Sequence, residues 1–239
     1  MSDRALPTPP AAGAESDARD RRTSTELIAA GVIDADLCAL LWLLIEAGVP
    51  LVVATDNAPS AAEEVRGALS GLVARQLVTA DGALAGGVVH GESLEDVLRF
   101  NGANPDDEVP DAARELGVVV ILGQPETGEL VRVVRAHYLR PIERDGAGHI
   151  QRRPPALLSA WDDSAGHLDH FHWGISNELA RRADREPGAF EVVHRRRTRL
   201  LDDLAAARVF DHAELRRHIE HAALVEASAV GSSQVDAPN

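Results

Sequence analysis

Three closely spaced histidines are the side chains of this sequence best suited to binding a metal ion. They are His167, His170 and His172, and Trp173 follows them. In a strand, His170 and His172 would share one face, as two ligands of one Zn²⁺ ion must. A site would also need a third ligand and a carboxylate that orients the histidines, for which Asp169 is a candidate. Histidines in a hairpin more often face solvent or bond locally, so the sequence favours no bound metal here.

A second polar segment has the layout of a phosphate-binding loop. The apolar run 50–54 predicts a buried parallel strand, and a helix is expected from about residue 61 to residue 75. In a strand, eight-residue loop and helix of this kind, glycine N–H groups, a Lys and a Ser or Thr hydroxyl hold nucleotide phosphates and Mg²⁺. The eight positions here are Thr55, Asp56, Asn57, Ala58, Pro59, Ser60, Ala61 and Ala62.

The residues that this chemistry requires are missing from the loop. Ser60 stands at the second glycine, Ala61 at the Lys and Ala62 at the hydroxyl residue. All 24 basic residues are Arg, so no Lys elsewhere in the chain can substitute. The planar fork of Arg is a poor replacement for a compact ammonium group. The sequence therefore predicts no bound cofactor, no catalytic residues and no nucleotide hydrolysis, and the loop is interpreted as a surface turn that Asp56, Asn57 and Pro59 favour.

Apolar periodicity and turn formers predict the elements that position these segments. Ser24 or Thr25 begins a short helix that Gly31 ends, and Asp34 caps a second helix that runs to Glu46. Further strands are expected at 87–90, 118–122 and 130–139, with a strand pair inside 155–172. Further helices are expected at 93–100, 110–116, 176–185, 189–206 and 211–227. On the second helix, Leu41, Trp42, Leu44 and Ile45 are expected to face the core.

Composition restricts the class of protein. A net charge of −14 argues against nucleic acid or an anionic membrane as the main partner. No apolar run is long enough to cross a bilayer and no signal peptide is recognised at the start of the sequence, so a cytoplasmic protein is expected. An acidic chain without Lys is typical of a halophilic archaeon, although codon bias gives the same composition.

Two further features receive a structural interpretation. Cys38 lies in an apolar run, where a buried thiol is expected rather than a reactive one. Arg199 follows the basic run 195–197, and Asp202 and Asp203 follow Arg199 at the helical spacings i+3 and i+4. Intrahelical ion pairs on a solvated face are therefore expected there rather than a nucleic-acid or lipid site.

Several segments, in a fixed order, resemble the secretion ATPases that drive type IV pili, archaella and type II or IV secretion. Segment 27–54 is similar to the helices and the strand that lead into the phosphate-binding loop of that family. Gly87-Val88-Val89-His90-Gly91-Glu92-Ser93 is similar to its His-containing segment, so His90 matches the family's nucleotide-positioning His. The further matching segments are 107–122, 130–135, 195–204 and 209–219.

The resemblance implies an α/β fold, namely a truncated P-loop-NTPase-like (RecA-like) and mostly parallel sheet with a helical C-terminal region. Only residues 63–89 separate Ala62 from His90, too few for the family's carboxylate-bearing strands and Mg²⁺-site strand. The expected organisation is a disordered leader at 1–23, a degenerate ATPase-like core at 24–150, a strand pair and helices at 151–227, and a disordered tail at 228–239.

The expected function is that of a non-catalytic homologue that binds or regulates another protein. An intact secretion ATPase paralogue and the membrane platform protein of such a motor are the expected partners. Two alternatives stay open: a secretion ATPase that still binds ATP or hydrolyses it weakly, and a stand-alone regulatory domain without a role in secretion.

Overall fold

The computed structural model describes residues 21–73, 86–100, 117–125, 130–141, 143–144, 146, 149–151 and 153–233. The helix expected at 110–116, the turn at 126–129, residues 1–20 and residues 234–239 lie outside the described ranges. In chain order, the elements are α2 (Ser24–Ala29), α3 (Ala35–Glu46), β1 (Leu51–Thr55), α4 (Pro59–Ser70), β2 (Gly86–His90), α5 (Leu94–Phe100), β3 (Val118–Gly123), β4 (Arg132–Tyr138), β5 (Glu143–Arg144), β6 (Ile150–Gln151), β7 (Ala156–Asp162), β8 (His167–His170), the 3₁₀ helix η2 (His172–Ile175), α7 (Ser176–Arg182), α8 (Pro187–Ala206) and α9 (His212–Ser233).

Side-chain caps set the starts of the first two helices. The hydroxyl of Thr23, one residue before the predicted cap, accepts a hydrogen bond from the Glu26 N–H at 3.3 Å. Asp34 caps α3 as predicted, because its carboxylate accepts from the Leu37 N–H at 2.9 Å. Thr23 is buried, and the Arg22 guanidinium pairs with Glu64 at 2.6 Å, so the folded part begins before the predicted boundary at residue 24.

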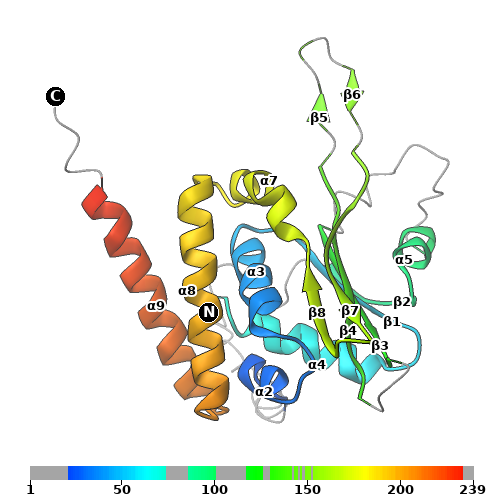
Figure 1. The fold of residues 1–239 in the computed structure, drawn as a ribbon, viewed down its shortest axis with the longest axis horizontal. Coiled ribbons are helices and arrows are strands. Elements are labelled where there is room, and N and C mark those ends of the chain that lie inside the picture. The colour runs from blue at the N-terminus through cyan, green and yellow to red at the C-terminus, as the bar shows by residue number, and fades with distance from the viewer. Residues whose placement is uncertain are drawn as a thin grey trace, which may run out of the picture.

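A six-stranded sheet in the order β2-β1-β3-β4-β7-β8 forms the centre of the molecule (Figure 1). β1 pairs in parallel with β2 and with β3, which fits a mixed α/β fold. β3–β4, β4–β7 and β7–β8 are all antiparallel, so the expectation of a mostly parallel sheet is wrong. The physical reason lies in the connections: only residues 163–166 join β7 to β8, too few for the crossover that parallel strands require.

Alternating side chains of β1 and β3 contribute to two hydrophobic layers. Val53 and Val120 face the larger core, which they share with α3, α4 and α8, while Ala54 and Ile121 face a smaller core that contains Val97 of α5. In Figure 1, α5 lies on one side of the sheet and α2, α3, α4 and α8 lie on the other. Burial on both faces explains the continuous apolar runs of these two strands.

α3 is the most deeply buried helix of the larger core. The residues expected to face the core, Leu41, Trp42, Leu44 and Ile45, are all buried, as are the other side chains from Leu37 to Leu43. Cys38 is fully buried, and burial raises the pKa of its thiol, which removes it as a nucleophile at neutral pH.

α8 packs against α2 and α3, and buried residues of α9 belong to the larger core, so the C-terminal helices do not form a unit of their own. β7 pairs directly with β4, so the sheet continues across the boundary expected at residue 150. α9 extends to Ser233, past the expected helix end at residue 227. β5 and β6 form a separate two-stranded ribbon that the sequence analysis did not predict.

Arg197 does not lie on a solvated face, so that expectation is wrong for this residue. Its guanidinium is 1% exposed and contacts Glu46 at 2.7 Å and Glu226 at 2.7 Å. It also lies 4.0 Å above the Trp42 ring. Arg197 lies on the same face of α8 as buried apolar residues. Its side chain therefore enters the core between α3, α8 and α9. Arg195, by contrast, is exposed and pairs with Glu191 at 3.6 Å within α8.

Within the described ranges, no helix combines the length and the apolar character that crossing a bilayer requires.

Candidate functional site

The connection between β1 and α4 is much shorter than the eight positions of a phosphate-binding loop. Only Asp56, Asn57 and Ala58 lie between the two elements, because α4 already begins at Pro59. The Thr55 hydroxyl accepts a hydrogen bond from the Ala58 N–H at 3.2 Å, which closes a tight turn. The positions expected for the second glycine, the Lys and the hydroxyl residue, 60–62, are therefore part of the first turns of a helix.

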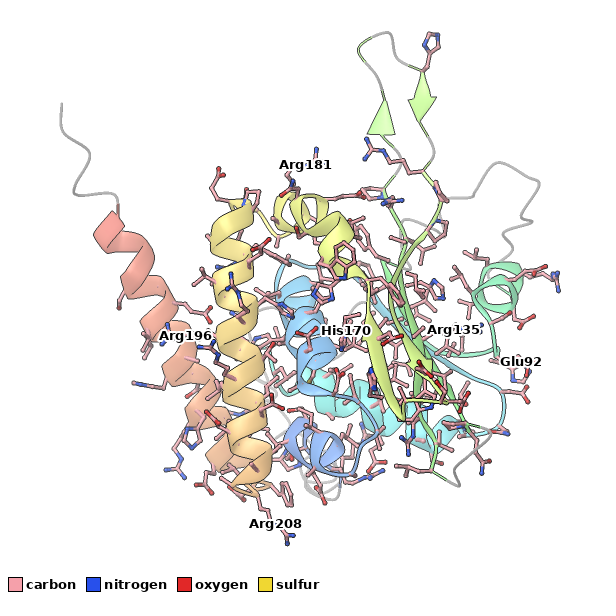
Figure 2. All side chains as sticks on the ribbon, viewed as in Figure 1. Glu92, Arg135, His170, Arg181, Arg196 and Arg208 are labelled. Carbon is pink, nitrogen blue, oxygen red and sulfur yellow. The ribbon has the colours of Figure 1, made fainter. Side chains whose placement is uncertain are left out.

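A shallow pocket of about 420 Å³ lies at the carboxyl ends of β1 and β2. We call it the strand-end pocket; its lining residues are Asp56, His90, Gly91, Glu92, Asp96 and Arg99. His90 Nε2 lies 3.3 Å from Asp56 Oδ1, and the two side chains are 67% and 52% exposed. Figure 2 labels Glu92 at the edge of the molecule near α5. The structure thus brings the family-matching His90 beside the short loop, in an open and solvated position.

The three histidines of the predicted hairpin separate into two environments. His167 is 60% exposed and lies 3.2 Å from Asp169. His170, at the end of β8, lies between the sheet and α3 (Figure 2), where its Nε2–H donates to Asp34 Oδ2 at 2.8 Å. His172, at the start of η2, is 12% exposed. His167 therefore does not belong with the other two, and Asp169 is not their carboxylate partner.

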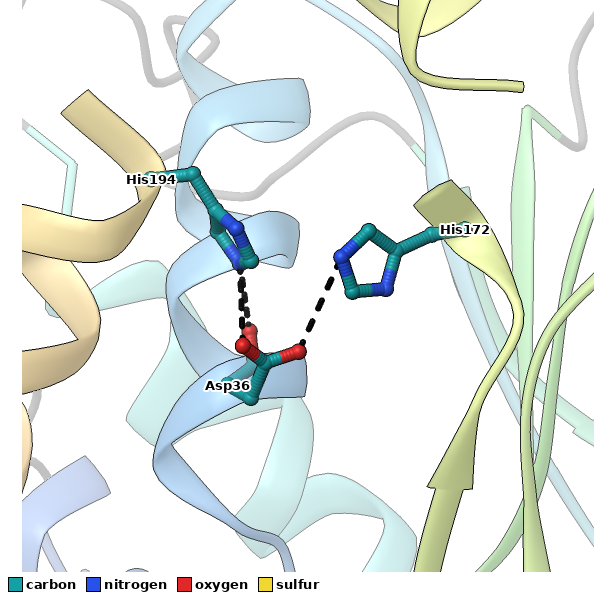
Figure 3. A group of neighbouring side chains, drawn as sticks. All are labelled: Asp36, His172 and His194. Carbon is teal, nitrogen blue, oxygen red and sulfur yellow. Dashed lines mark hydrogen bonds and ion pairs between the residues drawn. The ribbon is translucent and has the colours of Figure 1, made fainter. Parts of the chain in front are cut away.

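Two residues that the sequence analysis missed complete a group around Asp36 (Figure 3). One ligand atom each from Asp36, His172 and His194 lies within 4.8 Å of the other two. His172 Nε2 is 3.7 Å from Asp36 Oδ2, and His194 Nε2 is 3.7 Å from Asp36 Oδ1. His170 Nδ1 lies 3.3 Å from the same Oδ2 atom. We call these residues the histidine cluster: Asp34, Asp36, His170, His172 and His194.

Four elements hold the histidine cluster in place. Asp34 and Asp36 are fixed by the capped first turn of α3, since Asp34 uses one oxygen for the cap and the other for His170. His194 comes from the buried stripe of α8, and its Nε2–H donates to the Asp36 carbonyl at 2.9 Å. The rings of His172 and His194 meet edge to face with centroids 5.0 Å apart. The group therefore lies in the seam between α3, α8 and the β8–η2 segment.

The electrostatics of the histidine cluster differ from one ring to the next. Burial lowers the pKa of His172 to about 4, so this ring is neutral at pH 7. Burial also lowers the pKa of His170, but the hydrogen bond and charge of Asp34 outweigh this effect and raise the pKa above its usual value. Burial and the charges of Asp34, Asp203 and Asp36 raise the pKa of the nearby Asp202 carboxyl. The surroundings of the histidine cluster are thus rich in acidic side chains.

A sequence signal for one missed residue does exist. The buried stripe of α8 runs through Phe190, His194, Arg197 and Leu201 at helical spacing. Polar residues inside an apolar stripe mark buried groups that need partners. For Asp36 no such signal is present, because an acidic residue in the first turn of a helix is ordinary.

A scan against models of known protein families matches none of them, and a search of curated proteins also gives no match.

Proposed function

We propose that this protein is a non-catalytic homologue of the secretion ATPases that assemble type IV pili and related machines, and that it acts by binding another protein. The order of its elements supports this proposal. A helix pair leads into β1, a loop and α4, and the strand that carries His90 follows. We also propose that the parallel strands β2, β1 and β3 are the remainder of a P-loop-NTPase-like (RecA-like) sheet.

The position of β1 agrees with this ancestry. It lies between β2 and β3, both of which come later in the chain. In open α/β sheets, ligands bind at the carboxyl ends of the parallel strands, where strand order reverses. The strand-end pocket lies at that edge, where an active relative would hold nucleotide.

The main support for the proposed lack of catalysis is the structure of the β1–α4 turn. A phosphate-binding loop works because several free N–H groups point at the phosphates. Here the Ala58 N–H is bonded to the Thr55 hydroxyl at 3.2 Å, and Pro59 has no N–H to offer. The Asp56 carboxylate at the same turn repels phosphate. The turn from Asp56 to Pro59 therefore offers fewer donors than a phosphate-binding loop and carries negative charge, and both properties disfavour nucleotide binding.

Positive charge at the strand-end pocket is already neutralised. Arg99 lies beside the carboxylates of Glu95 and Asp96 on its own helix, at 2.5 Å and 4.0 Å. Asp56, Glu92 and Asp96 also line the pocket. No Lys occurs in the sequence to replace the missing phosphate contact.

Calorimetric titration with ATP and Mg²⁺ tests the first half of the proposal. We expect no saturable heat, because no group remains to hold the β and γ phosphates. Saturable binding at micromolar concentration would overturn this half and favour the alternative of an ATP-binding protein.

Repair of the loop tests whether the catalytic centre is lost as well. The triple variant S60G/A61K/A62T should release no phosphate above a control without enzyme, because the loop supplies only part of the transition-state stabilisation. The double variant S60G/A62T, which leaves Ala61 unchanged, is the matched control. Phosphate release by the triple variant, absent from the double variant, would show that catalytic carboxylates persist elsewhere in the chain.

The partner half of the proposal needs a separate test. Subunits of secretion ATPases pack as rings, so an intact paralogue is the first partner to try, followed by the membrane platform protein. We expect this chain to co-elute with the purified ATPase and to change its rate of ATP hydrolysis. If neither protein binds, the alternative of a stand-alone regulatory domain is favoured.

A further inference from the structure

The histidine cluster contains polar atoms that the described part of the chain leaves without hydrogen bonds. Asp36 Oδ2 is buried and no described residue bonds to it, although histidine nitrogens lie nearby. The Nδ1 atoms of His170 and His172 are buried in the same way. Buried polar groups are normally satisfied, because an unpaired one has lost its hydrogen bonds to water without gaining others. Several such atoms around one carboxylate call for a shared partner.

The spacing between these atoms fits an ion better than direct hydrogen bonds. Around Asp36 Oδ2, the distances to His170 Nδ1 and His172 Nε2 are 3.3 and 3.7 Å. Hydrogen bonds of this kind are about 2.7–3.2 Å long. Two ligands of a tetrahedral Zn²⁺ ion, each bonded at about 2.0–2.2 Å, are about 3.3–3.6 Å apart. These two distances are close to the edges of such a coordination sphere, and the ligand atoms of Asp36, His172 and His194 all lie within 4.8 Å of one another.

We propose that Asp36, His172 and His194 bind a divalent transition-metal ion, Zn²⁺ in the first place, and that His170, which lies beside this group, moves toward it to supply the fourth nitrogen. Imidazole and carboxylate together suit Zn²⁺ and its neighbours, whereas Mg²⁺ and Ca²⁺ prefer oxygen ligands alone. This inference does not depend on the proposed descent from an ATPase.

The outer contacts of the cluster match those of known metal ligands. A ligating histidine normally donates its other N–H to a carboxylate, which fixes the orientation of the ring. His170 does this through Asp34 at 2.8 Å, and leaves its Nδ1 facing Asp36. Because Asp34 is held by the cap of α3, the orienting carboxylate is itself rigid.

One existing bond must give way when the ion enters. His194 Nε2–H donates to the Asp36 carbonyl at 2.9 Å, and the same nitrogen is the one that faces the carboxylate. Metal binding replaces the proton on that nitrogen and releases it to solvent, so binding becomes weaker as the pH falls.

Titration of the untagged, full-length protein after removal of metal with a chelator tests this proposal. We expect one equivalent of Zn²⁺ to bind by calorimetry, and one equivalent of Co²⁺ to produce the visible absorption of a four-coordinate site. D36N and H172N should each weaken binding about tenfold or more, and D34N, which can keep the cap, about tenfold. H167N is the matched control, because His167 belongs to the same hairpin but faces solvent, and it should bind as the wild type does.

Several outcomes would overturn the metal centre. They are absence of saturable one-to-one binding of both ions, unchanged affinity in D36N and H172N, or equal loss in H167N. If H172N loses its circular dichroism spectrum, D36N decides in its place, since Asp36 is 34% exposed. The wild type provides a second readout: its melting temperature should rise with Zn²⁺ and not with the same concentration of Mg²⁺.

Discussion

The strand-end pocket and the histidine cluster are both groups of charged side chains, but they are built in different ways. The strand-end pocket comes from the end of β2, the short connections after β1 and β2, and α5. The side chains of its central pair, His90 and Asp56, are 67% and 52% exposed. The histidine cluster comes from α3, β8, η2 and α8, and His194 in it is 8% exposed. Residues 36 and 194 are far apart in sequence, and the packed core brings them together.

This difference shows where chemistry can persist in such a chain. A phosphate-binding loop depends on a few adjacent residues, and here β1 and α4 form with Ser60, Ala61 and Ala62 at the positions that such a loop would use. The histidine cluster depends on the α3–α8 seam, whose core contacts also stabilise the fold. We therefore expect substitutions to have large effects in the seam and small effects at the strand-end pocket.

The largest effect is expected from Trp42→Ala. Trp42 is fully buried in α3, and its ring supports the Arg197 guanidinium at 4.0 Å. Truncation should lower the free energy of unfolding by about 3–5 kcal/mol, through lost burial and a residual cavity. Urea denaturation followed by circular dichroism measures this, with Trp173→Ala as the control, because Trp173 is 71% exposed. Equal stabilities of the two variants would mean that the α3–α8 seam is not the core of the molecule.

A smaller loss is expected from Arg197→Met, which keeps much of the side-chain volume but removes the charge. Glu226, 8% exposed, and Glu46 would then lose their partner. Removing one member of a buried pair costs up to about 3–5 kcal/mol. Glu46 reaches solvent and α9 can shift, so we expect about 2–3 kcal/mol.

Arg196→Met is the matched control for Arg197→Met. It also removes one positive charge from α8, but Arg196 is the exposed neighbour of Arg197. Its unfolding free energy should change by less than about 0.5 kcal/mol. A similar loss of unfolding free energy in both variants would indicate a general effect of the charge of α8 rather than of the buried contact. It would also remove one argument that the α3–α8 seam is rigid.

The sequence predicted the elements of this molecule better than their arrangement. Apolar runs and caps located α3, β1 and β3 within a residue or two, because burial and end-capping are local signals. The direction of β4 and β7 was missed, since the resemblance implied a mostly parallel sheet and pairing direction depends on connections. The strands β5 and β6, which were not predicted from the sequence, have only two residues each. Such short strands are too short to show a periodic pattern.

The candidate sites divide in the same way. The lack of the motif's second Gly, Lys and hydroxyl residue at positions 60–62 was readable from the sequence, because that motif is contiguous. The predicted shared strand face of His170 and His172 was wrong, because β8 ends at His170 and His172 begins η2. Their rings still lie near one another, with centroids 5.7 Å apart, but their partners were not readable from the sequence. Asp36 and His194 enter the histidine cluster only through the packing of α3 against α8, which a local pattern does not contain.

The smallest effect is expected at the strand-end pocket, from Asp56→Asn and His90→Gln. The pair is separated by 3.3 Å, and exposure of 67% and 52% lets water and salt screen its attraction. Exposed ion pairs contribute about 0–1 kcal/mol, so each variant should stay within about 0.5 kcal/mol of the wild type.

A double-mutant cycle separates the pair energy from other effects of the two substitutions. The coupling energy is measured by urea denaturation at low and at high salt. We expect a small value at low salt and a still smaller one at high salt, because salt screens exposed charges. The same cycle on Asp34 and His170, whose side chains are 40% and 22% exposed and 2.8 Å apart, provides the comparison and should give the larger coupling. If Asp56 and His90 instead couple by more than about 1 kcal/mol and salt leaves the value unchanged, the pocket is desolvated and structurally held. The contrast between an open, solvated pocket and a packed seam would then fail.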